Sequence, residues 1–176
     1  MQKESETKTL ELQVLLKERN IDVCCIQETH LNSSHRFSIR DYETFRRDRK
    51  DRPKGGILTL IKNTHAAAEV YRSEDEDTEV LGMKNPLTIY NLYSPPNKQL
   101  RSQVFQPDPD GWIIMDDFNS QSWGYDDLDH KGDEVEDWTI THNMVLINKA
   151  DVSAENTTRN GGCGIYIRQP TKPPLL

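Results

Sequence analysis

The chain has 176 residues, of which 34% are hydrophobic and 29% charged, with a formal net charge of −7. This composition is typical of one soluble globular domain large enough to bury a core, and the negative charge argues against a protein that coats nucleic acid nonspecifically. No apolar stretch approaches the roughly 18 residues of a membrane helix, and the first residues lack the apolar run of a secretory signal. We therefore expect an intracellular protein with no membrane partner.

The first predicted elements are a helix and a strand. Residues 9–20 are rich in helix formers and place Leu12, Leu15 and Leu16 on one side, with Asn20 as a stop. The apolar run from residue 21 has strand length and contains the neighbouring cysteines Cys24 and Cys25. The three cysteines of the chain fit neither a paired disulfide framework nor zinc spacing, so we expect reduced thiols buried in a strand.

Charge is distributed unevenly along the chain. Residues 36–54 contain eight Lys or Arg against four Asp or Glu, and residues 108–137 contain eleven acidic residues against one lysine. The first segment suits contact with phosphates and the second suits cations. Two solvated loops of opposite sign explain either segment equally well.

Further strands and one helix are predicted beyond the basic segment. Apolar runs at residues 57–63, 86–93, 112–115 and 144–148 have strand length, and a cramped hairpin around residues 84–85 is compatible with the pattern. Residues 134–143 predict a short helix, with Val135 and Trp138 at i, i+3. This order favours an α/β layered domain over residues 1–150. Residues 151–176 lose periodicity and predict a weakly structured tail in which only residues 164–167 resemble a strand.

Polar residues follow several of the predicted strands. Glu28, Tyr93, Asp117 and Asn119 each stand at or after a strand end, and loops at one edge of a layered domain can bring such residues together. Glu28 and Asp117 are oxygen ligands of the kind that Mg²⁺ takes, Asn119 can orient a water or a phosphate oxygen, and Tyr93 can donate to a phosphoryl oxygen. Taken singly, a Glu after a strand is more often a turn residue and a Tyr more often a packing residue.

Four motifs in order carry a family resemblance: "CIQETHL", "RPKGGILTLIKN", "YNLYSPPN" and "WIIMDDFNSQSWGYDD". They resemble the endonuclease/exonuclease/phosphatase superfamily, specifically the apurinic-type endonuclease domain of non-LTR (LINE-like, jockey-type) retrotransposons. The similarity runs from about residue 10 to residue 148. It implies a DNase I-like fold, an α/β two-layer β-sandwich with flanking helices that is incomplete in this chain.

The resemblance also implies an activity and its residues. The expected function is cleavage of one DNA strand in the nucleus, dependent on Mg²⁺ (or Mn²⁺). The resemblance implies that the domain was once joined to a reverse transcriptase and that the cut primes reverse transcription. By position, Glu28 matches the metal-binding glutamate, Tyr93 the active-site tyrosine, Asp117 the aspartate that activates or orients water, and Asn119 the asparagine that holds phosphate.

The basic stretch is a further candidate DNA-facing region, although no family motif assigns its residues individually. Its candidate DNA-binding residues are Arg46, Arg47, Arg49, Arg52 and Lys54.

Three departures from the family pattern predict weak cleavage. The chain begins without the first-strand asparagine, and nothing after residue 150 matches the closing Ser-Asp-His group, a role that neither His130 nor His142 can fill. Asp116 stands where the family has glycine, and its carboxylate would add bulk and negative charge beside a phosphate site. The serine motif at residues 120–122 is one residue shorter than in the family. Loss of such groups commonly costs about 10² to 10⁴ in rate.

These departures leave three interpretations open. The chain is an active or residually active endonuclease, or a truncated, decayed copy that binds nucleic acid or protein without cleavage or has no function. In the third interpretation the same fold acts on RNA, an inositol phosphate or a sphingolipid phosphodiester, since fold alone does not fix the substrate.

Overall fold

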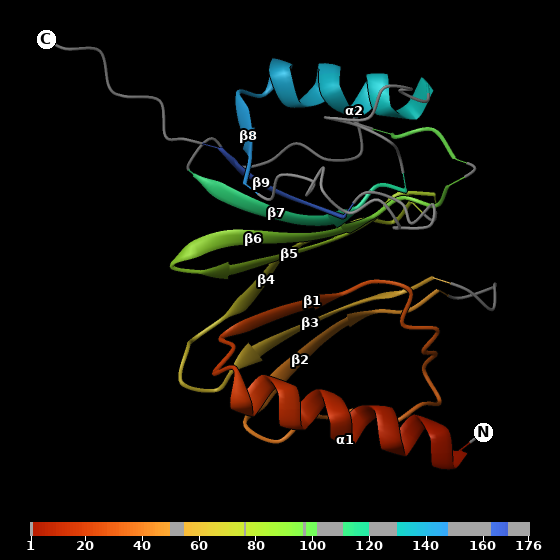
Figure 1. Cartoon of the computed structure of the whole chain (residues 1–176), viewed down its shortest axis with the longest axis vertical. Coiled ribbons are helices and arrows are strands. Elements are labelled where there is room, and N and C mark those ends of the chain that lie inside the picture. Colours follow the sequence, from red (N-terminus) through yellow and green to blue (C-terminus); the bar gives the residue numbers. More distant parts are fainter. Residues whose placement is uncertain are drawn as a thin grey trace, which may run out of the picture.

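The computed structural model describes residues 2–49, 55–75, 77–96, 98–101, 111–119, 130–147 and 163–168. Two β-sheets pack against each other, and one helix covers the outer face of each sheet (Figure 1). In chain order the elements are α1 (Gln2–Glu18), β1 (Val23–Ile26), β2 (Tyr42–Arg47), β3 (Ile57–Lys62), β4 (Ala68–Arg72), β5 (Glu79–Asn85), β6 (Leu87–Tyr93), β7 (Trp112–Asp117), α2 (His130–Thr141), β8 (Met144–Leu146) and β9 (Cys163–Arg168). This arrangement confirms the predicted α/β sandwich with flanking helices.

The smaller sheet contains three antiparallel strands in the order β1-β3-β2. Its central strand, β3, is buried on both faces because each face meets a different layer. Leu58 and Leu60 pack with Leu16 of α1, whereas Ile57 and Ile61 pack with Leu81 of the other sheet. The alternation of side chains along one strand therefore joins the helix, the small sheet and the large sheet.

The larger sheet contains six strands in the order β4-β5-β6-β7-β9-β8. Its pairs are antiparallel except for β6 and β7, which run parallel. The parallel pair places Tyr93 beside Asp117 in the register, so two strands that end in polar residues end together.

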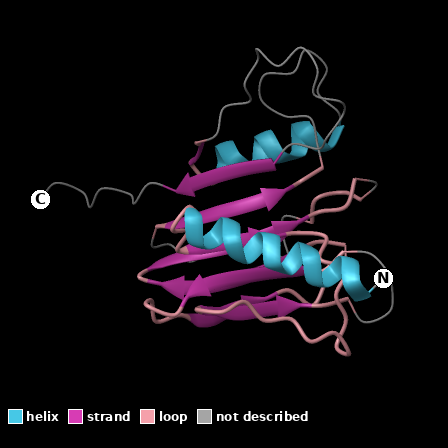
Figure 2. Cartoon of the chain, turned by 60° about the horizontal axis from the view of Figure 1, so that its bottom comes forward, coloured by secondary structure: helices cyan, strands magenta, loops and turns pink. Residues whose placement is uncertain are grey.

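The two helices cover opposite outer faces. In Figure 2, α1 lies in front of the strands. It ends at Glu18, and Asn20 follows with a positive φ of 49°, so the predicted stop is confirmed, since asparagine tolerates the left-handed conformation. On the other side, Val135 and Trp138 of α2 pack with Trp112 and Phe118, which confirms the predicted i, i+3 pair as a core contact. No helix in the described part of the chain is long and apolar enough to cross a membrane.

One strand of the larger sheet lies in the predicted tail, and two strands were missed by the sequence prediction. The run at residues 164–167, the one part of the tail that resembled a strand, falls within β9, which lies between β7 and β8 in the larger sheet. Neighbours on both sides supply its pairing, so tertiary contacts support a run that is too short to be convincing alone. The prediction also missed β2 and β4, which are edge strands of polar composition and mixed exposure.

Candidate functional site

The candidate site lies where β1, β6 and β7 end. Tyr93 is the last residue of β6 and Asp117 the last of β7, and their parallel register places both side chains on the same face of the sheet. Tyr93 packs with Ile57 and Leu81, so this face is the one that meets the smaller sheet. Glu28 follows β1 across the interface between the sheets, and the hydroxyl of Tyr93 donates a hydrogen bond to its Oε1.

A tight turn positions Glu28. The residue has a positive φ of 51°, and His30 two positions later has a φ of 53°. The Thr29 N–H donates to the Gly56 carbonyl at 3.1 Å, and the His30 N–H donates to the Gly55 carbonyl at 2.9 Å. Gly56 must lack a side chain, because it has a φ of +85° and a Cβ there would lie 2.7 Å from Oγ1 of Thr29. The glycine pair thus fixes the turn that carries Glu28.

Burial and the neighbouring Glu28 carboxylate shift the pKa values of Tyr93 and Asp117. Burial raises the pKa of the Tyr93 hydroxyl, and its hydrogen bond to Glu28 raises that pKa further. Burial also raises the pKa of Asp117, and the nearby charge of Glu28 adds to the effect, while the N–H of Asn119 and the ammonium of Lys131 oppose it. A pair of neighbouring carboxylates is the kind of ligand set that a divalent cation takes in proteins.

Asn119 lies beside Asp117 in a left-handed turn with a φ of 50°. Its backbone N–H donates to Oδ1 of Asp117 at 3.1 Å, and its Nδ2 donates to the Ser94 carbonyl at 3.2 Å. The structure therefore brings all four predicted residues, Glu28, Tyr93, Asp117 and Asn119, to one edge of the sandwich. One amide hydrogen of Nδ2 holds the loop after β6, and a second hydrogen remains on that nitrogen.

Asp116 occupies the opposite face of β7. Burial alternates along this strand, and Asp116 shares the buried side with Trp112 and Ile114, which pack toward α2. The side chain is 1% exposed. The expected negative charge beside the phosphate site is therefore absent from that face, because one step along a strand reverses the side-chain direction.

Lys131 is a component of the site that the sequence prediction missed. It lies in the first turn of α2, is 8% exposed, and its Nζ donates to the carbonyls of Ser94 and Pro95 at 3.1 and 2.7 Å. Its positive charge acts against the rise that burial causes in the pKa of Asp117. One sequence feature could have indicated Lys131: it is the one lysine among eleven acidic residues between positions 108 and 137.

Within the basic segment, Arg46 and Arg47 bind partners in the protein, whereas Arg36 and Arg40 are exposed. Arg46 binds Asp48 at 2.6 Å and donates to the carbonyls of Asn32 and His35. Arg47 is 7% exposed and donates to the carbonyls of Ser73 and Asp75. These contacts give no support to Arg46 and Arg47 as DNA-facing residues.

Of the other three predicted DNA-binding residues, the structure describes only Arg49. Arg49 makes an ion pair with the buried Glu79. Arg52 and Lys54 lie outside the described residues, so their assignment stays a prediction.

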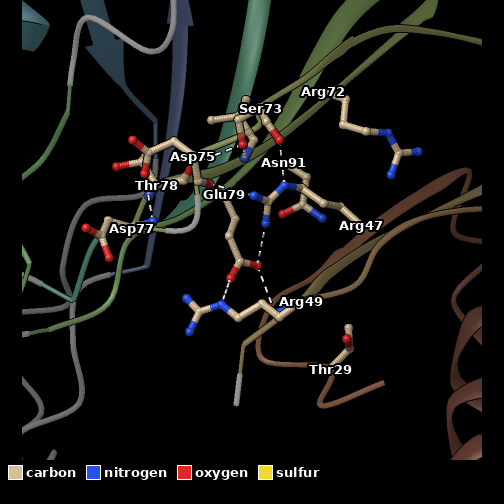
Figure 3. Close-up of polar contacts among 12 residues, drawn as sticks. Thr29, Arg47, Arg49, Arg72, Ser73, Asp75, Asp77, Thr78, Glu79 and Asn91 are labelled. Atoms are coloured by element: carbon tan, nitrogen blue, oxygen red, sulfur yellow. Dashed lines mark hydrogen bonds and ion pairs between the residues drawn. The ribbon is translucent and has the colours of Figure 1, made fainter. Parts of the chain in front are cut away.

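Glu79 lies at the centre of a polar cluster between the sheets, another feature that the sequence prediction missed. Figure 3 shows its carboxylate between the side chains of Arg47 and Arg49. Oε2 accepts the Gly56 N–H at 2.8 Å and lies 3.6 Å from Nη1 of Arg47, while Oε1 accepts from Nε of Arg49. Burial raises the pKa of Glu79, and the two arginines and the amide act against that rise. The cluster adjoins the site, because the Arg49 guanidinium lies 5.9 Å from the centre of the Tyr93 ring.

Asn91 forms a second polar link between the sheets. It is fully buried, donates from Nδ2 to the Leu58 carbonyl at 2.9 Å, and accepts from Nε2 of Gln27 at 2.9 Å. Gln27 precedes Glu28 directly, so this link fixes the approach of β1 to the site.

The donor set fits a hard divalent cation with few protein ligands. Within the described ranges no cluster of three or more His, Cys, Asp or Glu side chains that could hold a metal ion is present, and Asp117 is near enough to Glu28 for the Glu28 charge to raise its pKa. Mg²⁺ is usually held by one or two carboxylates, with waters and substrate phosphate completing its shell. A cavity of about 570 Å³ between α1 and the turn after β1 is lined in part by Glu28 and His30.

The fold is shared with two solved nucleases, although no protein-family model matches the chain. One is the endonuclease domain of TRAS1, a telomere-specific non-LTR retrotransposon, with a TM-score of 0.72 and 16% identity over 92% of this chain and 79% of that one. The other is an AP endonuclease from Archaeoglobus fulgidus, with a TM-score of 0.60 and 11% identity over 92% and 82%. Both are consistent with the resemblance seen in the sequence and confirm the fold that it implies.

Proposed function

We propose that the chain hydrolyses phosphodiester bonds of DNA as a divalent-metal-dependent endonuclease of the retrotransposon type. The observation that carries the proposal is the contact of Tyr93 with Glu28 beside Asp117, which unites three strand ends in one acidic site. The two similar structures named above are nucleases, and one comes from a non-LTR retrotransposon, which favours DNA as the substrate and an ancestral link to a reverse transcriptase.

Each residue of the site has a role that its contacts support. Glu28, with Asp117 nearby, would hold Mg²⁺ or Mn²⁺, which supplies Lewis-acid stabilisation of charge on the phosphate when bound. Asp117 accepts a hydrogen bond and, with its raised pKa, is suited to orient the attacking water and accept its proton. Tyr93 keeps its proton at neutral pH and orients Glu28.

Asn119 would hold the phosphate from the loop side. Its second amide hydrogen donates without adding charge, and its position is fixed through the Ser94 carbonyl. Lys131 donates to the Ser94 and Pro95 carbonyls of the same loop, so the side chains of two residues, Asn119 and Lys131, hold that loop in place.

Supercoiled plasmid with Mg²⁺ tests the proposal. The purified chain is expected to convert it to the nicked form, with loss of the activity in EDTA and in Asp117→Ala. Asp77→Ala serves as the matched control, because Asp77 is an aspartate of surface ion pairs with Lys98 and Arg101. Equal nicking by the wild type and by Asp117→Ala would reject the endonuclease in favour of a noncatalytic remnant.

A further inference from the structure

The buried pair of Glu79 and Arg49 has no assigned role in the proposed reaction. Glu79 is 0% exposed, and the Arg49 side chain is 10% exposed. Taking two charges out of water is costly, and apolar residues of similar size commonly replace such pairs without loss of stability. A buried pair at this place therefore calls for an explanation beyond folding.

The pair closes a ring of contacts around the site. Tyr93 donates to Glu28, the turn after Glu28 bonds to Gly55 and Gly56, the Gly56 N–H donates to Glu79, and Glu79 binds Arg49 over the Tyr93 ring. Glu79 thus touches both segments that position the site. One carboxylate oxygen fixes the glycine turn, and the other fixes the cation on the tyrosine.

The local sequence accommodates this ring at Gly55. A Cβ on that residue would lie 2.4 Å from Nε of Arg49 and 2.7 Å from Oε1 of Glu79, and its φ is +92°. Only glycine allows the backbone to approach the ion pair so closely. The glycine pair therefore serves the Glu28 turn on one side and the Glu79 pair on the other.

We propose that Glu79 and Arg49 are positioning residues of the proposed nuclease site, with Glu79 holding the Arg49 guanidinium against Tyr93 and thereby fixing Tyr93 and Glu28. The inference rests on the proposed function for its kinetic consequence, and its structural consequence is measurable without cleavage. A cation held over an aromatic ring restrains that ring, and small displacements of reacting groups can cost about 10²-fold in rate.

Fluorine NMR of the full chain labelled with 3-fluorotyrosine measures the structural consequence. The Tyr93 resonance is assigned by its absence in Tyr93→Phe. Glu79→Gln and Arg49→Met are each expected to move that resonance. The double variant is expected to match Arg49→Met, since glutamine keeps an oxygen acceptor for the Gly56 N–H and the substitution therefore acts through Arg49. Glu69→Gln, which breaks the exposed ion pair with Arg72, is the matched control and is expected to leave the resonance in place.

Plasmid nicking by the same variants measures the kinetic consequence. Glu79→Gln is expected to lower kcat about tenfold or more and to leave KM within about threefold of wild type. The substitution displaces the groups that act in the chemical step and leaves substrate binding intact. If Glu79→Gln fails to fold, Arg49→Lys gives the same test, since lysine has neither the Nε–H that donates to Glu79 nor a planar guanidinium to cover the ring.

The outcomes separate the two proposals. A Tyr93 resonance and a kcat that stay at wild-type values in Glu79→Gln, or in Arg49→Lys where the former does not fold, would overturn the positioning role. Additive shifts in the double variant would also overturn it. Absence of metal-dependent nicking by the wild type, with the expected resonance shifts, would overturn the proposed function and support the positioning role.

Discussion

The hydroxyl of Tyr93 donates a hydrogen bond to Oε1 of Glu28, 65 positions earlier in the chain. Tyr93 belongs to the six-stranded sheet and Glu28 follows the first strand of the three-stranded sheet. The bond therefore spans the two layers, and the geometry of the site depends on how the sheets pack. Asn91 and Glu79 join the same layers through polar contacts nearby.

Replacing Tyr93 by Phe is expected to lower the rate of metal-dependent nicking about 10- to 100-fold while the chain stays folded, because Glu28 loses the donor that orients it. Single-turnover rates measure the effect. Tyr90→Phe is the matched control, since Tyr90 lies on the opposite face of β6 and packs edge-on against Trp112. Similar losses in both variants would contradict the role given to Tyr93.

Replacing Lys131 by Met is expected to destabilise the chain by about 1.5–3 kcal/mol, because the carbonyls of Ser94 and Pro95 lose a charged donor in a buried position. Urea unfolding with a comparison of m-values measures the change. Lys98→Met, which removes a half-exposed partner of Asp77, is expected to change stability by less than about 0.5 kcal/mol. Equal effects of the two substitutions would contradict a structural role for Lys131.

Replacing Asp117 by Asn is expected to stabilise the fold at neutral pH while it removes cleavage. The pKa of Asp117 is raised in the folded state, so wild-type stability falls as the pH rises from about the ordinary value of 3.8 through the folded value. The asparagine variant lacks this loss. Because the group is partly solvated, we expect a rise in Tm of about 1–2 °C at pH 7 that shrinks toward pH 4. A lower Tm than wild type at pH 7 would contradict the electrostatic cost.

The adjacent cysteines are expected to resist alkylation in the folded chain. Burial raises the pKa of the Cys25 thiol to about 12 and raises that of Cys24 as well, so the reactive thiolate is scarce at pH 8. Iodoacetamide labelling followed by tandem mass spectrometry measures each thiol, with urea-unfolded chain as the reference. Labelling of Cys25 at the same rate in both states would be the contrary result.

Several elements and the positions of the four site residues were predictable because local patterns carry them. Hydrophobic runs indicate β1, β3, β6 and β7, and the polar residues that follow these runs indicate the site. Periodicity also indicates α2 through the contact of Val135 and Trp138. In these places local propensity, burial pattern and fold agree.

The buried charges were not predictable in the same way. Arg47 and Arg49 lie in a segment whose composition favours contact with phosphate, and their inward direction depends on Glu79, which is 30 or more positions away along the chain. A lone glutamate at the start of a strand gives no sign that it is buried. Asp116 and Asp117 are two neighbouring aspartates with the same chemistry. Only the alternation of side chains along β7 decides which of them faces the site.

The most direct measurement compares Asp116→Asn with Asp117→Asn in metal-dependent nicking of a supercoiled plasmid. The neighbouring carboxylates have the same chemistry and opposite directions, so the comparison tests which face of β7 carries the site. Asp117→Asn is expected to lower the rate at least about 100-fold, and Asp116→Asn is expected to stay within about threefold of wild type. Equal losses, or a greater loss in Asp116→Asn, would contradict a site formed by Glu28, Tyr93 and Asp117.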